Sequence, residues 1–285
     1  MNSIMKMLHD ICTNVRSRVN TMSREEAGIS LARGAGGDIT KKIDKVGEDA
    51  ALEVVRRYGI DCIVVSEEAG VVYSNSKRGE DDGDDVSDVK DGNGMCFIAL
   101  DAIDGTTNAV RGIPFYSCSV AYAVSDRLRS VTHAAVMDLT SGDIYYAVKG
   151  YGAYMNGSRI KTLDVSSDKA GYVIGVNLSG ISIDKLNRMG RILAMTNHIR
   201  QLGSNALEMC LLARGLLDAY IDVRGKIRVT DIAAAYLIVI EAGGIVVDEH
   251  CKVLDAPLNL DARLSFIASA NEYILNYIFS SIASA

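Results

Sequence analysis

The sequence has little positive charge to offer a polyanion. Its 285 residues include 30 Lys and Arg against 36 Asp and Glu, which gives a formal net charge of −6. Proteins that bind nucleic acid need a basic face that releases counterions from the phosphates, so we expect no nucleic-acid partner. Small cationic or metal-bound ligands suit this charge better.

Cysteine patterns that signal zinc or disulfides are missing. The six cysteines lie far apart in the sequence, without a CxxC pair and without a nearby histidine at zinc-ligand spacing. We therefore expect buried free thiols in a reducing compartment. These residues are Cys12, Cys62, Cys96, Cys118, Cys210 and Cys251.

An uninterrupted hydrophobic run of membrane-spanning length is also missing. The most apolar stretch, residues 232–247, is broken by Glu241 and by the pair Gly243-Gly244. The N-terminal residues lack the cationic-then-apolar order of a signal peptide. We therefore expect a cytoplasmic protein with no membrane partner.

What is present is the composition of a globular α/β protein. Hydrophobic residues make up 48% and charged residues 23%, and no internal repeat occurs at a fixed period. Apolar residues at three- and four-residue steps predict helices, and short β-branched runs predict strands. The predicted helices cover residues 4–19, 41–58, 206–214 and 232–240, and the predicted strands cover 60–65, 97–100, 117–124, 131–139, 144–148, 172–177 and 218–223. We expect a single unit over residues 1–285.

Residues 73–94 differ in kind from the rest of the chain. After Tyr73 this segment has only two aliphatic side chains among many acids, glycines and serines, so it cannot bury enough surface to order itself. The acid spacing of a calcium loop is not met at Asp82, Asp84 or Asp88. We therefore predict a solvated, mobile acidic insertion.

Four acids stand at the ends of predicted elements. Glu67 follows one strand, and Asp101 and Asp104 follow another. Asp231 opens a helix, and such positions are where α/β sheets gather ligand sites. Two bare carboxylates about 5 Å apart repel by roughly 3 kcal/mol at an effective dielectric constant near 20, so a cluster of four requires a cation. Ligands that are all oxygen favour Mg²⁺ or Mn²⁺ over zinc.

The residues after the second aspartate suit a phosphate. Gly105 and Thr106 precede residues 107–109, which can begin a helical turn with unpaired N–H groups. A phosphate held by metal would meet these donors, and the Thr106 hydroxyl would lie within reach of a water on the metal. The pattern Asp-x-x-Asp-Gly alone is more often a turn in which Asp caps backbone N–H groups. Its combination with Glu67 and Asp231 favours the metal-phosphate site.

These stretches resemble the signatures of the inositol monophosphatase superfamily. The matching stretches are residues 37–44 (GDITKKID), 65–68 (VSEE), 101–108 (DAIDGTTN), 229–235 (VTDIAAA) and 241–244 (EAGG). They span nearly the whole chain in the family's order, and only the acidic insertion falls outside. Residues 218–231 resemble the archaeal branch, whose members hydrolyse fructose 1,6-bisphosphate and inositol monophosphates.

The resemblance implies an α-β-α-β-α five-layer sandwich of the sugar phosphatase type. It also implies a homodimer that binds two or three Mg²⁺ ions per site, with Mn²⁺ as a substitute. The metal ligands that it implies are Glu67, Asp101, the Ile103 carbonyl, Asp104 and Asp231. The implied catalytic residues, which position the attacking water, are Asp44, Glu67 and Thr106. The implied substrate-binding residues are Asp104, Gly105, Thr106, Arg200, Ser204, Asp222 and Arg224.

Two residues depart from the family's pattern. The family usually has Pro where this chain has Ala102, and an aromatic residue is common where it has Thr230. Ala102 loosens the Asp-x-Ile-Asp turn without removing a ligand. Thr230 bears on substrate contacts and leaves the metal ligands intact.

Two features have more than one interpretation at this point. Residues 34–37 complete neither GxGxxG nor a P-loop, and they form either a mobile loop or a lid over the metal site. Arg200 either clamps a second substrate phosphate or makes a surface ion pair.

The chain is thus expected to be an Mg²⁺-dependent phosphomonoester hydrolase that acts on fructose 1,6-bisphosphate and inositol monophosphate through an activated water. Its partners are then small phosphorylated sugars or inositols. A nucleotide 3'-phosphatase of the same fold is one alternative. A catalytically silent binding or regulatory homologue is another, and its mark would be a lost metal ligand. No such ligand is lost in this sequence.

Overall fold

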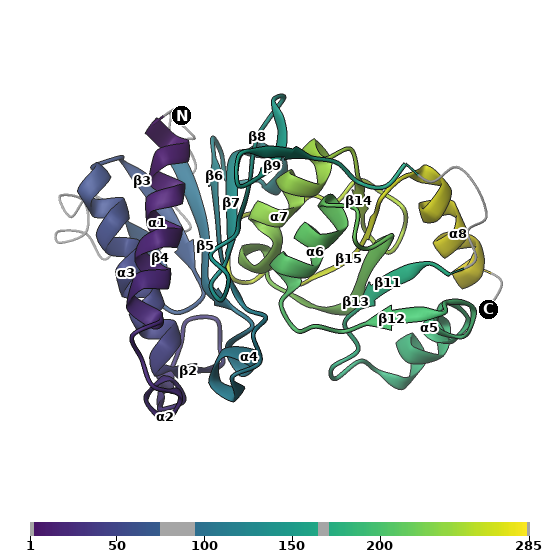
Figure 1. The fold of residues 1–285 in the computed structure, drawn as a ribbon, viewed down its shortest axis with the longest axis horizontal. Helices are drawn as coiled ribbons and strands as arrows, with labels where there is room; N and C mark the ends of the chain where they lie inside the picture. Colours follow the sequence, from purple (N-terminus) through teal and green to yellow (C-terminus); the bar gives the residue numbers. More distant parts are fainter. Residues whose placement is uncertain (1–2, 75–94, 165–170, 284–285) are drawn as a thin grey trace.

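The computed structural model describes residues 3–74, 95–164 and 171–283. Its helices and sheets stack in layers (Figure 1). The first layer consists of α1 (Ser3–Val19) and α3 (Lys42–Tyr58), which pack together on one face of an eight-stranded sheet.

The middle layer lies between this sheet and a second, five-stranded sheet (Figure 1). It contains α6 (Asn205–Ala213) and α7 (Val229–Glu241). The far face of the second sheet is covered by α5 (Ile183–Met195) and α8 (Glu272–Ala283). This α-β-α-β-α order confirms the predicted five-layer sandwich and the α/β class.

The eight-stranded sheet has the strand order β10-β9-β8-β7-β6-β5-β3-β4. Neighbouring strands are antiparallel except for β3 and β5, which run parallel. The parallel pair brings the C-terminal ends of β3 and β5 to the same edge of the sheet. The strands are β3 (Cys62–Ser66), β4 (Gly70–Tyr73), β5 (Cys96–Asp104), β6 (Ser117–Ala123), β7 (Val131–Asp138), β8 (Ile144–Val148), β9 (Gly152–Met155) and β10 (Ser158–Ile160).

The five-stranded sheet has the strand order β12-β11-β13-β15-β14. β11 runs parallel to β12 and β13, whereas β15 runs antiparallel to β13 and β14. Its strands are β11 (Val173–Val176), β12 (His198–Arg200), β13 (Ala219–Ile227), β14 (Ile245–Val247) and β15 (Leu264–Ser269). The remaining elements are the ribbon of β1 (Ser30–Arg33) and β2 (Ile39–Lys41), the short helices α2 (Arg24–Ala27) and α4 (Thr106–Arg111), and a 3₁₀ turn at Leu128–Ser130.

The apolar pattern of each helix explains its layer. Every residue of α7 from Val229 to Val239 is buried. A helix that is hydrophobic around its whole circumference suits an interior position, and α7 contacts both sheets. In contrast, α1 buries one stripe of residues, at Met5, Met7, Leu8, Ile11, Cys12, Val15 and Val19. The sequence pattern therefore places α7 between the sheets and α1 at the outside.

Two predicted strands are longer in the structure than in the prediction. β5 does not end at Leu100, because it continues to Asp104 and includes Asp101. Its pairing with β6 shifts register between Asp101 and Asp104, so the strand bends while it stays paired. β13 similarly extends past its predicted end to Ile227.

The start of the acidic insertion was predicted too early. Tyr73 is the last residue of β4. The Ser74 hydroxyl accepts the Cys62 N–H at 2.9 Å and donates to the Ile60 carbonyl at 2.5 Å, so both residues belong to the sheet's edge. The prediction of a mobile segment over residues 75–94 lies outside the described residues.

The prediction of buried cysteines is confirmed for five of the six, whereas Cys251 is exposed. Cys251 lies in a tight turn, where its N–H donates to the Asp248 carbonyl and its φ is 60°. A turn with left-handed backbone lies at the surface because its peptide groups need water or local partners.

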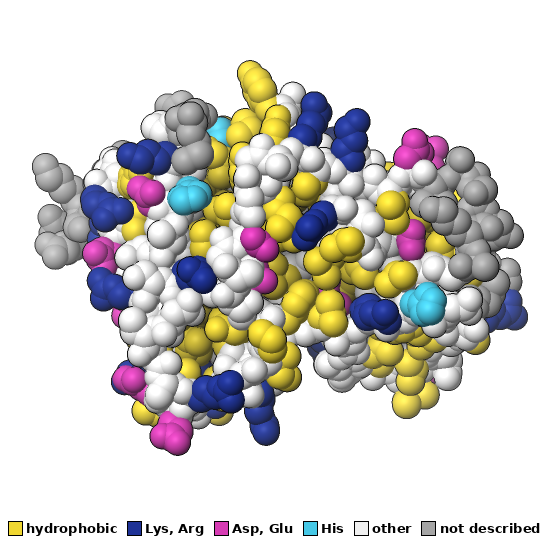
Figure 2. Space-filling view, viewed as in Figure 1, with side chains coloured by type: hydrophobic (Ala, Val, Ile, Leu, Met, Phe, Trp, Pro, Cys, Tyr) yellow, Lys and Arg dark blue, Asp and Glu magenta, His cyan; other side chains and the backbone are white. Residues whose placement is uncertain are grey.

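The surface mixes charged and apolar side chains. On the face seen in Figure 2, Lys and Arg side chains are scattered among acidic and apolar ones. None of the described helices combines the length and the apolar content that crossing a membrane requires.

Candidate active site

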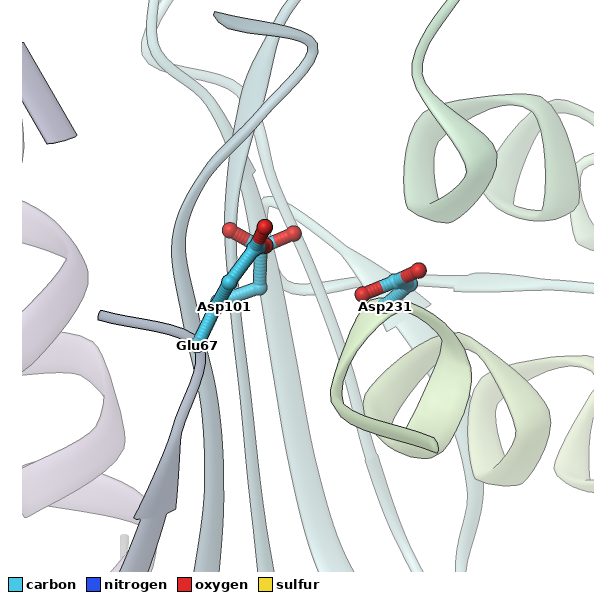
Figure 3. A group of neighbouring side chains, drawn as sticks. All are labelled: Glu67, Asp101 and Asp231. Carbon is cyan, nitrogen blue, oxygen red and sulfur yellow. The ribbon is translucent and has the colours of Figure 1, made fainter. Parts of the chain in front are cut away.

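Three carboxylates meet at the edge where β3 and β5 come together. Ser66 and Leu100 are register partners in this parallel pair, so Glu67 and Asp101 follow side by side. Asp231 lies in the first turn of α7 and faces them from the middle layer (Figure 3). One carboxylate oxygen from each of the three acids lies within 4.8 Å of the other two. The structure therefore brings together acids that are up to 164 positions apart in the numbering of the chain.

Burial and mutual repulsion favour the protonated form of these acids. Burial raises the pKa of Glu67 to about 8, and the charge of Asp231 adds to this effect. The pKa of Asp101 is raised well above its ordinary value, first by burial and then by repulsion from Glu67. Burial also raises the pKa of Asp231. A cation bound among them would favour the ionised forms, so metal binding and proton release are linked.

The donor set fits a hard divalent cation. All three side chains offer carboxylate oxygens, which Mg²⁺ and Mn²⁺ prefer, and within the described residues no His or Cys belongs to the group. A cavity of about 10 Å³, lined by Glu67 and Asp101, has room for about one water-sized particle. Glu48 also lines this cavity, and among the described residues its buried Oε2 has no hydrogen-bond partner. That oxygen is a further acceptor for a water or a cation.

Asp44 and Thr106 form a hydrogen-bonded pair that lines the same cavity. The Thr106 hydroxyl lies 2.7 Å from Asp44 Oδ1 and 3.1 Å from the Ile103 carbonyl oxygen. The other Asp44 oxygen accepts the Lys41 N–H at 2.8 Å, which holds the carboxylate at the start of α3. Burial raises the pKa of Asp44, and these hydrogen bonds oppose the shift. The structure thus brings Asp44, Ile103 and Thr106 together, as their predicted roles require.

Asp104 lies near this group, but its carboxylate contacts the start of α6. Its Oδ2 accepts the Ser204 hydroxyl at 2.5 Å and the Ala206 N–H at 2.8 Å, and its Oδ1 accepts the Asn205 N–H at 3.3 Å. Burial raises the pKa of Asp104 to about 7, although these hydrogen bonds oppose it. Asp104 therefore satisfies N–H groups that the helix leaves unpaired. Its roles toward metal and substrate stay predictions.

Gly105 and Ser204 lie where the end of β5 approaches the start of α6. Gly105 has a φ of 98° and precedes α4. A Cβ there would lie 3.1 Å from the Gly203 carbonyl oxygen, so only glycine allows this approach without displacement. Ser204 is fully buried and its hydroxyl is bound to Asp104. The predicted substrate contacts of Gly105 and Ser204 stay predictions.

The other predicted substrate residues lie on the second sheet. Asp222 is fully buried, and the Arg224 guanidinium forms a forked pair with it, with Nη2 at 2.6 Å from Oδ2 and Nε at 2.9 Å from Oδ1. Arg200 lies exposed on β12 and donates from Nη1 to the Ile199 carbonyl at 2.9 Å. Among the described residues no acid lies within ion-pair distance of Arg200, so the surface ion pair, one of its two interpretations, is not formed in this structure.

Arg228 is a site residue that the sequence did not reveal. Its Nη1 donates to Glu67 Oε1 at 2.7 Å, and its Nη2 contacts Asp38 and donates to the Gly36 carbonyl at 2.9 Å. Its positive charge opposes the raised pKa of Glu67. Its backbone N–H donates to Asp231 Oδ2 at 3.0 Å at the start of α7. Arg228 therefore binds two of the three clustered acids, one by each end of the residue.

The glycine-rich segment at residues 34–37 lies against Glu67. The Gly36 N–H donates to the Glu67 carbonyl at 2.7 Å, and the Ala35 N–H donates to the Glu68 carbonyl at 3.2 Å. A Cβ at position 36 would lie 2.9 Å from Glu67 Cγ, so glycine is needed for this approach. These contacts place the segment beside the acid cluster, which is where a lid would have to lie.

Known proteins resemble this chain over nearly all of its length. The family model described as the inositol monophosphatase family matches residues 4–283. A fructose-1,6-bisphosphatase/inositol-1-monophosphatase of Methanothermobacter thermautotrophicus is 38% identical over 87% of this chain and 84% of its own length. A bifunctional NADP phosphatase/NAD kinase of Methanococcus maripaludis is 31% identical over 93% of this chain, which spans 47% of that protein. A crystal structure of an inositol monophosphatase–fructose 1,6-bisphosphatase superposes with a TM-score of 0.80 at 28% identity, covering 99% of this chain and all of the other.

Proposed function

Because the chain belongs to the inositol monophosphatase family and is a phosphatase, we propose that it hydrolyses fructose 1,6-bisphosphate and inositol monophosphate with Mg²⁺ or Mn²⁺ as its cofactor. The observation that carries the proposal is the convergence of Glu67, Asp101 and Asp231 on one point. Relatives from Methanothermobacter thermautotrophicus and Thermococcus kodakarensis that are named for both substrates support the substrate range.

The side chains at the cluster have separate tasks in this proposal. Glu67, Asp101 and Asp231 hold the cation. When bound, the cation supplies positive charge to the phosphate oxygens and lowers the pKa of water. Asp44 accepts the hydrogen of the Thr106 hydroxyl, which leaves lone pairs on that oxygen free to accept a hydrogen bond from the attacking water. Thr106 thereby orients the water, and Asp44 sets the orientation of Thr106.

The proposal includes two or three ions per site. The Ile103 carbonyl and Asp104 complete the ligand set. To bind an ion, the Asp104 carboxylate has to turn at least one oxygen away from the start of α6. The substrate contacts of Gly105, Ser204, Asp222 and the two arginines at 200 and 224 belong to the same proposal. So do the homodimer, the single unit over residues 1–285 and the cytoplasmic location.

Release of inorganic phosphate tests the proposal directly. The substrates are inositol 1-phosphate, fructose 1,6-bisphosphate and 3'-phosphoadenosine 5'-phosphate, each with Mg²⁺ and with EDTA. We expect release from the first two only with Mg²⁺, and none from an Asp101→Asn variant that is at least as thermally stable in EDTA as the wild type. Release from the nucleotide alone would favour the nucleotide 3'-phosphatase alternative. Release that EDTA leaves unchanged would contradict the metal assignment.

A further inference from the structure

A second cavity, of about 480 Å³, opens beside Asp231, and more basic than acidic side chains line it. Its lining includes the backbone around residues 36–38 and the whole segment 224–228. Pockets of this size hold small-molecule ligands. The basic residues that line it are Arg224, Lys226, Arg228 and Arg263. Four cations thus border one cavity next to an acid of the metal cluster.

The irregular end of β13 gathers these cations. The register between β13 and β15 shifts before Ile227, and Gly225 has a φ of 70° in the shifted stretch. Leu264 pairs with Ile227, so Arg228, which follows β13, and Arg263, which precedes β15, lie just beyond this last pair. Basic residues from β13 and from the two segments beside this pair therefore line the same cavity.

Two of the four cations already have carboxylate partners. Arg224 Nη2 lies 2.6 Å from Asp222 Oδ2. Arg228 contacts Asp38 and lies 2.7 Å from Glu67. A charge that is balanced by a neighbouring acid attracts an anion weakly, so these two arginines add little net charge to the cavity.

The other two cations lack such partners. Lys226 is exposed and its Nζ donates to the Gly180 carbonyl at 2.7 Å. Arg263 is exposed and its Nη1 donates to the Leu260 carbonyl at 2.6 Å. Within the described part of the chain, no carboxylate lies within 4 Å of either nitrogen head group. A neutral carbonyl does not balance their charge, so each keeps donors and charge for an anion.

The positions of these two cations select the kind of anion. The phosphate that is hydrolysed has to lie at Glu67, Asp101 and Asp231. An anion at Lys226 and Arg263 lies in the adjoining cavity, which shares only Asp231 with that cluster. One substrate fills both places only if it carries a second phosphate.

We infer that Lys226 and Arg263 bind the phosphate group of the substrate that is not hydrolysed, and that they favour a sugar bisphosphate over a monophosphate. This inference rests on the proposed function. Arg263 is suited to the task because its planar guanidinium can donate two parallel hydrogen bonds to one phosphate. It replaces Arg200 as the residue that distinguishes the two substrates, since Arg200 is not among the residues that line the cavity.

Steady-state kinetics of point variants tests the inference. The variants are Lys226→Ala and Arg263→Ala, with Arg191→Ala as a matched control because Arg191 is an exposed arginine on α5 away from both cavities. We expect each of the first two to lower kcat/KM for fructose 1,6-bisphosphate by about 10- to 100-fold, mainly through KM. The values for inositol 1-phosphate should change less than about threefold, and the control should match the wild type on both.

Several outcomes would overturn the inference. One is an equal loss of kcat/KM for the two substrates in Lys226→Ala and Arg263→Ala. Another is a loss of kcat/KM selective for fructose 1,6-bisphosphate that is larger in Arg200→Ala than in Arg263→Ala. NADP is tested as a third substrate, because its diphosphate also offers a second anionic group. A loss confined to NADP would assign the two cations to a dinucleotide and overturn the sugar bisphosphate assignment, whereas equal losses on NADP and the bisphosphate would support a general second-phosphate site.

Failure of the proposed function is distinguishable from failure of the inference. If the wild type releases phosphate from no substrate, the proposed function is wrong. Fructose 1,6-bisphosphate is then not consumed, and calorimetry with Mg²⁺ measures its Kd for the wild type and the variants. A Kd that rises at least about 10-fold in Arg263→Ala would still support the inference, and an unchanged Kd would overturn it.

Discussion

Two groups of acids in the described part of the chain differ in what surrounds them. Glu67, Asp101 and Asp231 lie within 4.8 Å of one another at the edge of the first sheet. Asp104 and Glu208 are not part of this group of three, and each uses both oxygens to accept backbone N–H groups near the start of α6. The three acids of the first group surround a shared point, whereas the two acids of the second group accept hydrogen bonds from the backbone.

The comparison shows what marks a metal site. Burial raises the pKa of Glu67 to about 8, and burial raises the pKa of Glu208 to about 8 as well. A raised pKa alone therefore does not separate the groups. The separating feature is that the acids of the first group face one another, because this arrangement is unfavourable unless a cation lies between them.

The largest expected effect is on activity in Asp101→Asn. The variant keeps the shape of the side chain and loses its charge, so we expect phosphate release to fall by more than about 100-fold at saturating Mg²⁺. A phosphate-release assay measures it, and a melting temperature in EDTA that is no lower than that of the wild type checks the fold. Activity within tenfold of the wild type would show that the first group does not hold the catalytic cation.

The pH dependence of stability tests Glu208 in the second group. Its folded pKa of about 8 lies above the ordinary value of 4.5, so the folded state holds its proton longer than the unfolded chain does. The stability that this proton contributes is complete below about pH 4.5 and is lost as the pH rises toward 8. Between pH 5 and 8 the free energy of unfolding of the wild type should therefore fall. We expect this fall to be smaller by a few kcal/mol in Glu208→Gln, as measured by denaturant unfolding at each pH. Parallel stability curves for the two proteins would contradict this assignment.

One substitution made in both groups should change stability in opposite directions. Asp104→Asn replaces one accepting oxygen by an amide NH₂, which then faces the backbone N–H of either Asn205 or Ala206, so we expect a loss of about 1–3 kcal/mol. Asp101→Asn relieves repulsion and should stabilise the chain in EDTA. Urea unfolding of both variants in EDTA measures the difference. A loss of equal size in both would remove the distinction between the groups.

The smallest expected effect concerns Arg228, the cation that already contacts Glu67. Arg228→Ala removes its bonds to Glu67, Asp38 and the Gly36 carbonyl, so we expect hydrogen exchange at residues 34–38 to quicken by about 10-fold. Arg228→Lys is the matched variant, because one ammonium cannot make the same set of forked contacts. Protection that survives in Arg228→Ala would show that the glycine segment is held by its own backbone bonds.

Some of this organisation was predictable from the sequence. The three acids of the cluster could be singled out because each follows a predicted strand or opens a predicted helix, and parallel pairing of β3 and β5 places Glu67 beside Asp101. The five layers followed from the resemblance, and the apolar run of α7 from Ile232 to Ile240 agrees with its interior place.

Other parts depended on distant contacts. Arg228 contacts Glu67 across 161 positions of the chain, so no local pattern marks it. The direction of the Asp104 carboxylate depends on the start of α6, 101 and 102 residues later. The basic cavity depends on the irregular pairing of β13 with β15, which brings Arg263 to Arg228. Short strands such as β10 and β14 carry too few residues for a period to appear.

The central claim is that Glu67, Asp101 and Asp231 together bind a divalent cation. Isothermal titration of Mg²⁺ into the metal-free chain, beside Asp101→Asn at the same pH, tests this most directly. We expect a saturable isotherm with at least one ion per chain in the wild type and a Kd raised by at least about 10-fold in the variant. Identical isotherms for the two proteins would contradict it, since Mg²⁺ would then bind elsewhere.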